Sequence, residues 1–251
     1  MNTQATLEQL KQLRLEGMAQ SYEAILGLPI NQHPDAHPML AQLTQHEIQS
    51  KAEKRTRMFL RLSRLRYVAS IEQIACSPKR NLTKEQLSLL ADCAWIDRAE
   101  NLVITGATGC GKSFLACALG HQGCLLGYKT LYLNMNRFIE KITLSRLDGT
   151  FIKVLNQIEK VRLLILDDFG LQPLSSEIRL ALLQILEDRY QRKSTLVASQ
   201  LPVNKWHDYI ADPTLADAIL DRLTAQTHKI ELKGESMRRK SKTTKPKNDN
   251  E

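Results

Sequence analysis

The feature that most restricts the fold is a glycine-rich segment, GATGCGKS, at residues 106–113. It matches the pattern G-x-x-x-x-G-K-[ST], follows the apolar run NLVIT, and opens the helix-like stretch KSFLACALGHQ. A strand, a loop and a helix in that order let backbone N–H groups and a helix N-terminus surround phosphate groups. We expect Lys112 to reach the β- and γ-phosphates of a nucleotide and the Ser113 hydroxyl to ligate Mg²⁺. The residues expected to bind the nucleotide are Gly106, Ala107, Thr108, Gly109, Cys110, Gly111, Lys112 and Ser113.

A second segment, RLLILDDFG at residues 162–170, places two acids directly after four apolar residues. A buried parallel strand presents such acids at its carboxyl end, where ligands bind in sheets of this kind. We expect Asp167 to hold Mg²⁺, through water, and Asp168 to polarise the attacking water. The alternative is a strand followed by an acid that caps a helix.

Three more polar residues are candidates for the same site. Ser199, next to Gln200, ends the apolar run of TLVASQLP and is a candidate sensor of the γ-phosphate. Arg222, in AILDRLT, lies on a helical pattern and is a candidate for stabilising transition-state charge on a neighbouring subunit. Arg238, in GESMR, is a candidate second phosphate sensor. The simpler explanations are a strand-end turn, an ion pair with Asp221 and the general charge of the tail, respectively.

Beyond Asn101 the chain alternates short apolar runs with amphipathic helical stretches. This alternation is typical of an α/β fold, in which helices cover a parallel sheet. The five runs are 102–105, 130–134, 163–166, 196–199 and 230–232. Only 17 residues follow Gly234, too few for a full C-terminal helical lid, so we expect a neighbouring protomer to enclose the nucleotide.

The first 100 residues have helical rather than strand periodicity. They predict one helix over 3–26 and a second over 39–67, with a proline-containing linker between them. A third helix is expected over 83–94, where Thr83 and Gln86 can form a capping box. The expected domains are a helical domain over 1–70, a nucleotide-binding domain over 71–234 and a basic tail over 235–251.

The net charge of +8 is concentrated in two segments. Residues 51–66 contain seven basic side chains and one acid, and residues 237–251 contain six basic side chains and two acids, so the remainder carries −2. In the first segment, basic residues at steps of three and four form one stripe of a helix beside an apolar stripe. This arrangement fits a helix that contacts the phosphates of duplex DNA, although a solvated helix face explains the charge equally well. The residues expected to contact DNA are Lys54, Arg57, Arg61 and Arg64.

The sequence lacks the signals of export and of membrane insertion. No apolar run is long enough for a transmembrane helix, and the N-terminal segment has no apolar core of a secretory signal. Five cysteines without a C-x-x-C spacing argue against zinc and fit a reducing compartment. We therefore expect a cytoplasmic protein with no membrane partner.

Together these segments resemble the AAA+ class of P-loop ATPases and, within it, the IstB-type insertion-sequence ATPases, relatives of the DnaC helicase loaders. The resemblance covers residues 5–240. It rests on LEQLKQLRLEGMAQSYEAIL and RLSRLR in the N-terminal part, and on ITGATGCGKSFLACALG, LLILDDFG, ASQLPVNKWHDYI and AILDRLTAQTHKIELKGESMR in the ATPase part. The first and last blocks are distinctive of the family, whereas the glycine-rich and LDD blocks occur in many ATPases.

The resemblance implies a five-stranded parallel sheet of order 5-1-4-3-2, preceded by a small all-helical N-terminal domain. It implies that residues 106–113 bind ATP with Mg²⁺ and that Asp167 and Asp168 form the Walker B pair, whose second Asp in place of Glu implies slow hydrolysis. It also implies that Ser199 is sensor-like and that Arg222 is an arginine finger acting in trans. The implied partners are duplex DNA, on which the protein assembles as a homo-oligomer with ATP, and a cognate transposase that it stimulates.

Three other functions fit part of the sequence. A DnaC-like replicative helicase loader shares the ATPase segments, but the N-terminal block favours the insertion-sequence class. A P-loop kinase for small molecules would need a substrate pocket and a lid with phosphate-binding arginines, whereas this chain has basic helices and a basic tail. A DNA-binding scaffold that holds ATP without hydrolysing it is disfavoured by the intact Lys112, Asp167 and Asp168.

Overall fold

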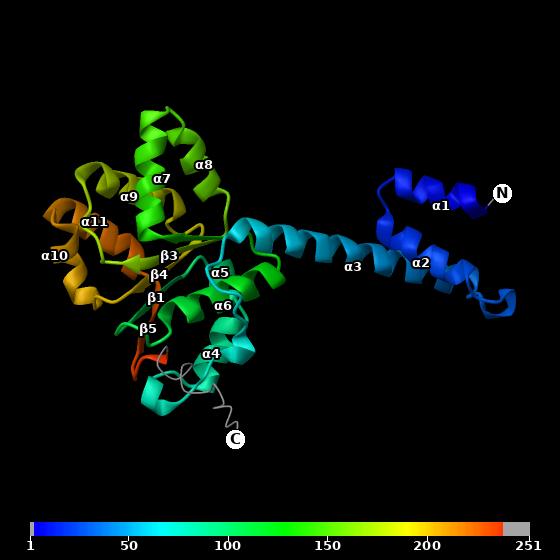
Figure 1. Cartoon of the computed structure of the whole chain (residues 1–251), viewed down its shortest axis with the longest axis horizontal. Helices are drawn as coiled ribbons and strands as arrows, with labels where there is room; N and C mark the ends of the chain where they lie inside the picture. Colours follow the sequence, from blue (N-terminus) through cyan, green and yellow to red (C-terminus); the bar gives the residue numbers. More distant parts are fainter. Residues whose placement is uncertain (1–2, 238–251) are drawn as a thin grey trace, which may run out of the picture. The chain divides into compact units, whose positions relative to one another are not determined.

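Figure 1 shows the computed structural model of the chain, which describes residues 3–237. The contacts within the chain form two compact units that meet between Met58 and Phe59. The domain boundary that we expected at residue 70 is not where the contacts divide. The segment after Phe59 packs with the second unit, where the Tyr67 ring lies 6.1 Å from the ring of Phe114.

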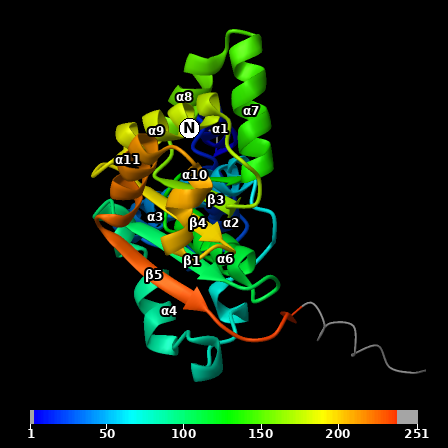
Figure 2. The ribbon, with the colours of Figure 1, turned by 90° about the vertical axis from the view of Figure 1, so that its left-hand side faces the viewer.

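The second unit is built on a five-stranded sheet in which every neighbouring pair of strands runs parallel. The strands are β1 (Asn101–Gly106), β2 (Thr130–Asn134), β3 (Leu163–Phe169), β4 (Ser194–Ser199) and β5 (Thr227–Leu232). Their order is β2-β3-β4-β1-β5, with β5 at one edge beside β1 (Figure 2). This is the predicted order 5-1-4-3-2 read from the other edge, so the predicted α/β sheet is confirmed.

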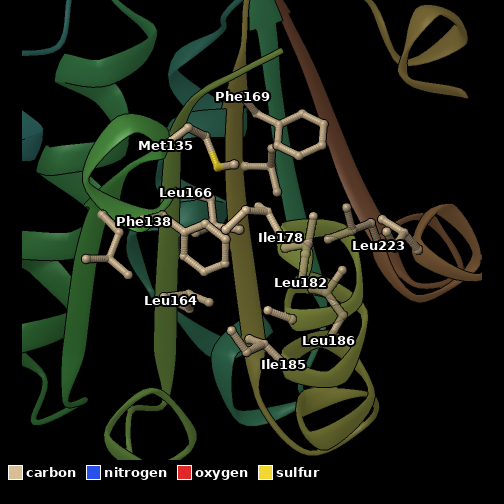
Figure 3. Close-up of a cluster of buried hydrophobic side chains, with 14 of the residues drawn as sticks. Met135, Phe138, Leu164, Leu166, Phe169, Ile178, Leu182, Ile185, Leu186 and Leu223 are labelled. Atoms are coloured by element: carbon tan, nitrogen blue, oxygen red, sulfur yellow. The ribbon is translucent and has the colours of Figure 1, made fainter. Parts of the chain in front are cut away.

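Helices cover both faces of this sheet. They are α4 (Lys84–Ala91), α5 (Ala94–Asp97), α6 (Lys112–Leu125), α7 (Met135–Leu147), α8 (Phe151–Glu159), α9 (Ser176–Arg189), α10 (Trp206–Ile210) and α11 (Pro213–Thr224), with 3₁₀ turns η2 (Ile71–Gln73), η3 (Pro78–Arg80) and η4 (Val203–Lys205). On one face, Leu166 of β3 packs with Phe138 of α7 and Leu182 of α9 (Figure 3). On the other, Ile104 of β1 packs with Leu115 of α6. Because β3 and β4 are buried on both faces, their sequences are continuous apolar runs rather than alternating ones.

The capping box predicted before α4 is confirmed. Thr83 N donates to Gln86 Oε1 at 3.0 Å, and Gln86 N donates to Thr83 Oγ1 at 3.2 Å. The helix ends at Ala91, however, earlier than the predicted residue 94. It stops there because Cys93 adopts a left-handed conformation, with φ of 58°, and a separate short helix, α5, follows.

The first unit is helical, as predicted. It contains α1 (Thr3–Gln12), α2 (Glu16–Leu26), the 3₁₀ turn η1 (Ile30–Gln32) and most of α3 (Ala36–Ser63), which continues into the second unit. The prediction of one helix over residues 3–26 is wrong, because Arg14 has a left-handed φ of 58° and separates α1 from α2. The chain turns at this point and α1 contacts α2, with Leu7 of α1 buried.

In the described part of the chain, no helix is long and apolar enough to cross a membrane. All five cysteines are free thiols, and four of them are buried. Burial raises the pKa of Cys93 to about 12, and it also raises the pKa of Cys117 and of Cys124. These thiols therefore stay protonated at neutral pH and pack as small apolar side chains.

Helices α2 and α3 approach so closely that a side chain at Gly17 has no room. A Cβ on Gly17 would lie 2.4 Å from the carbonyl oxygen of His46. We expect Gly17→Ala to destabilise the first unit by about 1–3 kcal/mol, because the two helices must separate. Urea denaturation followed by circular dichroism measures this change. The control is Gly27→Ala, whose Cβ would come no closer than 3.5 Å to its nearest neighbour, the oxygen of Ala24; an equal loss in both variants would contradict the explanation.

Candidate nucleotide site

The glycine-rich segment, called the P-loop below (residues 106–113), joins β1 to α6. The strand ends at Gly106 and the helix begins at Lys112, so the loop leads directly into a helix N-terminus. Gly106 has φ of +144°, and a Cβ there would lie 2.2 Å from the carbonyl oxygen of Leu232 at the end of β5. Only glycine fits where the loop leaves the sheet.

A cavity of about 490 Å³ lies beside the P-loop. Tyr67 and Ile74, from the segment before α4, contribute apolar surface to its lining. Lys112 at the start of α6, Asp168 near the end of β3 and Gln200 just after β4 add polar groups to the lining. A pocket with both apolar and polar lining suits a ligand made of a base and a phosphate chain.

Lys112 is held by the loop that it follows. Its side chain is largely buried, and its ammonium group donates to the carbonyl oxygens of Gly106 and Ala107, both at 2.9 Å. An ammonium has three donors, so one remains for a phosphate oxygen. The loop thus keeps the positive charge at the cavity.

The two predicted magnesium ligands lie next to each other. Ser113 Oγ donates to Asp167 Oδ1 at 3.0 Å, and two oxygen ligands of an octahedral Mg²⁺ lie about 3 Å apart, so the pair fits this ion. Asp167 is fully buried, and its Oδ2 accepts a hydrogen bond from the Tyr132 hydroxyl at 2.5 Å. Burial and this hydrogen bond raise the pKa of Tyr132, so the phenol remains a donor to the carboxylate.

Asp168 is turned toward the cavity by an irregularity in β3. It has a left-handed φ of 59°, and the pairing of β3 with β4 shifts register between Leu166 and Phe169. Asp168 Oδ2 accepts a hydrogen bond from Asn134 Nδ2 at 2.6 Å and lies 3.5 Å from Nη1 of Arg66. Within the described residues no such partner binds Oδ1, which leaves that oxygen for a water molecule.

Tyr132, Asn134 and Arg66 support the two acids, and none of them was predicted from the sequence. Tyr132 and Asn134 lie two positions apart at the carboxyl end of β2, so they share one face, and Asn134 pairs with Asp167 in the sheet. Polar residues at that spacing at a strand end are the signal that reveals them. Arg66 carries no such signal, because it is 102 positions from Asp168.

The predicted sensor Ser199 forms hydrogen bonds with backbone groups. Its buried hydroxyl donates to the carbonyl oxygen of Phe169 at 2.6 Å and accepts from the N–H of Leu201 at 3.0 Å. These bonds hold the turn after β4. The next residue, Gln200, lines the cavity, and its Oε1 accepts a hydrogen bond from Thr108 Oγ1 of the P-loop at 2.7 Å.

Arg222 is not among the residues that line the cavity of its own chain. It lies on α11, where its guanidinium contacts Glu187 Oε1 of α9 at 2.6 Å and Asp221 Oδ2 at 3.1 Å. The guanidinium also lies 5.7 Å from the centre of the Tyr190 ring. The ion pair with Asp221 that we considered from the sequence is therefore present. Arg238, the second predicted sensor, lies outside the described residues.

The predicted DNA-contact residues lie on α3 or just beyond its end. Arg57, in the first unit, and Arg61 and Arg64, in the second, are exposed. Lys54 forms an ion pair with Glu16 of α2, so its charge is partly compensated within the first unit. Three of the four side chains are therefore free of any ion pair in the described part of the chain.

In the second unit, Arg64 also lines a second cavity, of about 820 Å³, together with Arg137 and Lys141 of α7. Burial, followed by repulsion from Arg64, lowers the pKa of Lys141. The lining also includes the acids Glu140 and Asp148, which offset part of this positive charge.

The chain matches the family model of IstB-like ATP binding proteins over residues 8–245. It is 40% identical over 234 residues to the insertion sequence ATP-binding protein y4pL of Sinorhizobium fredii, covering 93% of this chain and 96% of that protein. It is 28% identical over 233 residues to the insertion sequence IS21 ATP-binding protein of Pseudomonas aeruginosa, covering 93% of this chain and 88% of that protein. These relatives are named for ATP binding and for the insertion sequences that encode them.

Solved structures share the fold of the second unit. AMPPCP-bound DnaA from Aquifex aeolicus superposes with a TM-score of 0.57 at 20% identity, covering 70% of this chain and 53% of DnaA. The DnaC helicase loader superposes with a TM-score of 0.53 at 17% identity, covering 66% of this chain and 98% of DnaC. Together with the sheet order, these similarities confirm the predicted AAA+ P-loop fold. Because the family model spans nearly the whole chain, this protein belongs to the IstB-like ATP binding protein family.

Proposed function

We propose that this protein is a cytoplasmic ATPase that assembles on duplex DNA and stimulates the transposase of its insertion sequence. The observation that supports the proposal is that the P-loop, Ser113 and Asp168 line one cavity, while the buried Asp167 lies directly behind it and accepts a hydrogen bond from Ser113. The relatives named for insertion sequences match over 93% of the chain, which supports transposition over replicative helicase loading as the process served.

Four side chains have separate roles in the proposed hydrolysis. Ser113 and Asp167 would hold Mg²⁺, directly or through water, and this ion would supply positive charge to offset the β- and γ-phosphates. Lys112 adds a second positive charge at the same phosphates. Asp168 accepts a hydrogen bond from the attacking water through its free Oδ1 and orients it in line with the γ-phosphorus.

We assign the role of γ-phosphate sensor to Gln200 instead of Ser199. The Ser199 hydroxyl donates its single proton to the carbonyl oxygen of Phe169, so donation to a phosphate oxygen would cost it that bond. The Gln200 side chain lines the cavity and is tied to Thr108, so a nucleotide that moves the P-loop also moves this amide.

Arg222 is proposed to act on the nucleotide of a neighbouring subunit. Its guanidinium does not line the nucleotide cavity of its own chain. Its side chain is 28% exposed, so a second copy can reach it. Arginine fingers supplied in trans accelerate such reactions by about 10³–10⁵. Completion of the site by a second copy would help to enclose a nucleotide in a chain whose described residues include no helical lid after β5.

Arg222→Ala is expected to leave ATP affinity unchanged and to lower hydrolysis at least about 100-fold. Mixing this variant with Lys112→Ala should restore activity, because a Lys112→Ala subunit still supplies Arg222 to its neighbour. ATPase assays on the single variants and on their mixture measure both effects. The control is Glu187→Gln, which removes one of the two carboxylate partners within the chain but keeps the arginine. A mixture as inactive as its components would rule out action in trans.

Neutralising Arg57, Arg61 and Arg64 together to glutamine is expected to weaken DNA binding by a similar factor on unrelated duplexes. Each lost phosphate contact should also flatten the plot of log affinity against log salt by about 0.9. Fluorescence anisotropy over a salt series measures both quantities. The control is Arg192→Gln, an exposed arginine that follows α9. Loss of affinity for one DNA sequence alone, or an unchanged slope of log affinity against log salt, would argue against contact with the phosphate backbone.

The function as a whole is tested with the purified protein, its neighbouring transposase and a DNA carrying the ends of the insertion sequence. ATP hydrolysis should rise with DNA and with protein concentration, since a second subunit completes the site. Strand transfer by the transposase should rise only when both the protein and ATP are present. Two results would overturn the proposal: ATPase activity per molecule that does not change on dilution or on addition of DNA, or strand transfer at the same rate with and without the protein.

A further inference from the structure

Arg80 lies at the nucleotide cavity, although no sequence motif marks it. It ends the 3₁₀ turn η3 in the segment before α4. Its Nη1 donates to the carbonyl oxygen of Ala75 at 2.7 Å, and its Nη2 donates to the carbonyl oxygen of Cys110, in the P-loop, at 2.8 Å. The guanidinium thus spans the segment before α4 and the P-loop, and it lines the cavity between them.

The charge of Arg80 has no partner inside the described part of the chain. Its side chain is half-buried, and no carboxylate oxygen of residues 3–237 forms an ion pair with it. A guanidinium has five N–H donors, and the two bonds to carbonyl oxygens leave three of them. A partly buried cation with spare donors on a cavity wall favours an anionic ligand.

The guanidinium reaches the part of the P-loop that leads into α6. Its Nη2 lies 3.0 Å from the position that a Cβ on Gly111 would occupy. Gly111 directly precedes Lys112, so the two cations approach one stretch of the loop from different segments. An anion that binds the N–H groups at the start of α6 therefore comes within reach of Arg80.

Backbone contacts already fasten the segment before α4 to the rest of the site. The carbonyl oxygen of Arg80 accepts from the N–H of Lys233 at 3.1 Å, and Asn81 Nδ2 donates to the carbonyl oxygen of Glu231 at 2.9 Å. These bonds do not need the Arg80 side chain. Replacing the side chain therefore leaves these two contacts in place.

We propose that Arg80 is a nucleotide-binding residue whose free N–H groups donate to the phosphate chain on the Gly111 side of the cavity. This inference rests on the nucleotide site of the proposed function. It supplies a phosphate-binding arginine from the segment before the sheet, in a chain whose described residues include no helical lid after β5.

The test compares Arg80→Gln with the wild type by calorimetric titration of ATP, ADP and inorganic tripolyphosphate, each with Mg²⁺. Tripolyphosphate has no base, so a change in its affinity reports on contacts with phosphate. It does not report on changes in the apolar part of the cavity near Ala75. We expect Arg80→Gln to weaken all three ligands about tenfold, the effect of one lost charge-assisted hydrogen bond. Lys79→Ala, at an exposed neighbouring lysine outside the cavity lining, should bind all three as the wild type does.

A second measurement uses the wild-type chain and does not depend on the variant folding. Phenylglyoxal modifies accessible arginines, and mass spectrometry locates them. Tripolyphosphate should protect Arg80 but not the exposed Arg192. Unchanged tripolyphosphate affinity in a folded Arg80→Gln variant, or modification of Arg80 at the same rate with and without the ligand, would overturn the assignment.

Failure of this inference can be told apart from failure of the nucleotide site itself. If the wild type binds ATP and Lys112→Ala abolishes that binding while Arg80→Gln retains it, only the role of Arg80 is rejected. If the wild type binds neither ATP nor tripolyphosphate, the site as a whole is rejected.

Discussion

Replacing Asp168 by asparagine is expected to slow ATP hydrolysis at least about 100-fold and to trap the ATP-bound protein on DNA, because an amide cannot polarise the attacking water as a carboxylate does. Asparagine nearly matches the shape of aspartate and tolerates the left-handed φ of 59° at this position, so the end of β3 should keep its conformation. ATP binding should persist, since Lys112 and Ser113 are untouched. Single-turnover hydrolysis and the lifetime of the DNA complex after ATP addition measure the two effects.

The matched control for this prediction is Asp188→Asn. Asp188 is an exposed acid on α9 that forms no ion pair among the described residues. Its replacement should therefore leave both the rate of ATP hydrolysis and the lifetime of the complex with DNA unchanged. Titration of ATP into Asp168→Asn separates failure to bind from failure to hydrolyse. Hydrolysis by Asp168→Asn at the wild-type rate would show that another group orients the water.

The elements of the second unit follow from local sequence, which is why they could be predicted. Strands β1 to β4 each contain a short apolar run, and the buried strands β3 and β4 need apolar residues on both faces. The P-loop is equally local, because strand, glycines and helix are continuous in the chain. Sheet order is not a local property, and it was anticipated only through the resemblance to the AAA+ class.

Side-chain direction at the strand ends was harder to predict. Ser199 and Gln200 are neighbours, and only the turn after β4 decides which of them meets the P-loop. At the end of β3, the register shift turns Asp168 toward the cavity while Asp167 stays buried. Such irregularities depend on how two strands pair, so a single sequence does not reveal them.

Contacts between distant segments were missed altogether. Arg66 reaches Asp168 across 102 positions, and Arg80 reaches Cys110 across 30. Arg66 lies beyond the end of α3, inside the helix that we predicted to continue to residue 67, and Arg80 ends a short 3₁₀ turn, so neither contact follows from local periodicity. The prediction of a single helix over residues 3–26 failed for a related reason. The residues around Arg14 keep a helical pattern, but the chain turns there and packs α1 against α2, which buries Leu7.

Lys112→Ala is expected to weaken ATP binding at least about 100-fold, equivalent to roughly 3 kcal/mol. The lysine is largely buried, and its ammonium is fixed by the carbonyl oxygens of Gly106 and Ala107 at the start of α6. Its removal takes the positive charge from the phosphate end of the cavity and leaves those two oxygens facing the phosphates. Calorimetric titration of ATP with Mg²⁺ measures the loss.

The control is Lys84→Ala, an exposed lysine at the start of α4 that forms no ion pair in the described part of the chain. It should bind ATP as the wild type does. If assembly on DNA needs bound ATP, Lys112→Ala should also fail to form the large complex, while its individual subunits still bind DNA weakly through Arg57, Arg61 and Arg64. Full ATP-dependent assembly of Lys112→Ala would therefore contradict a nucleotide site at this P-loop, because Lys112 is the buried lysine that the loop holds at the cavity.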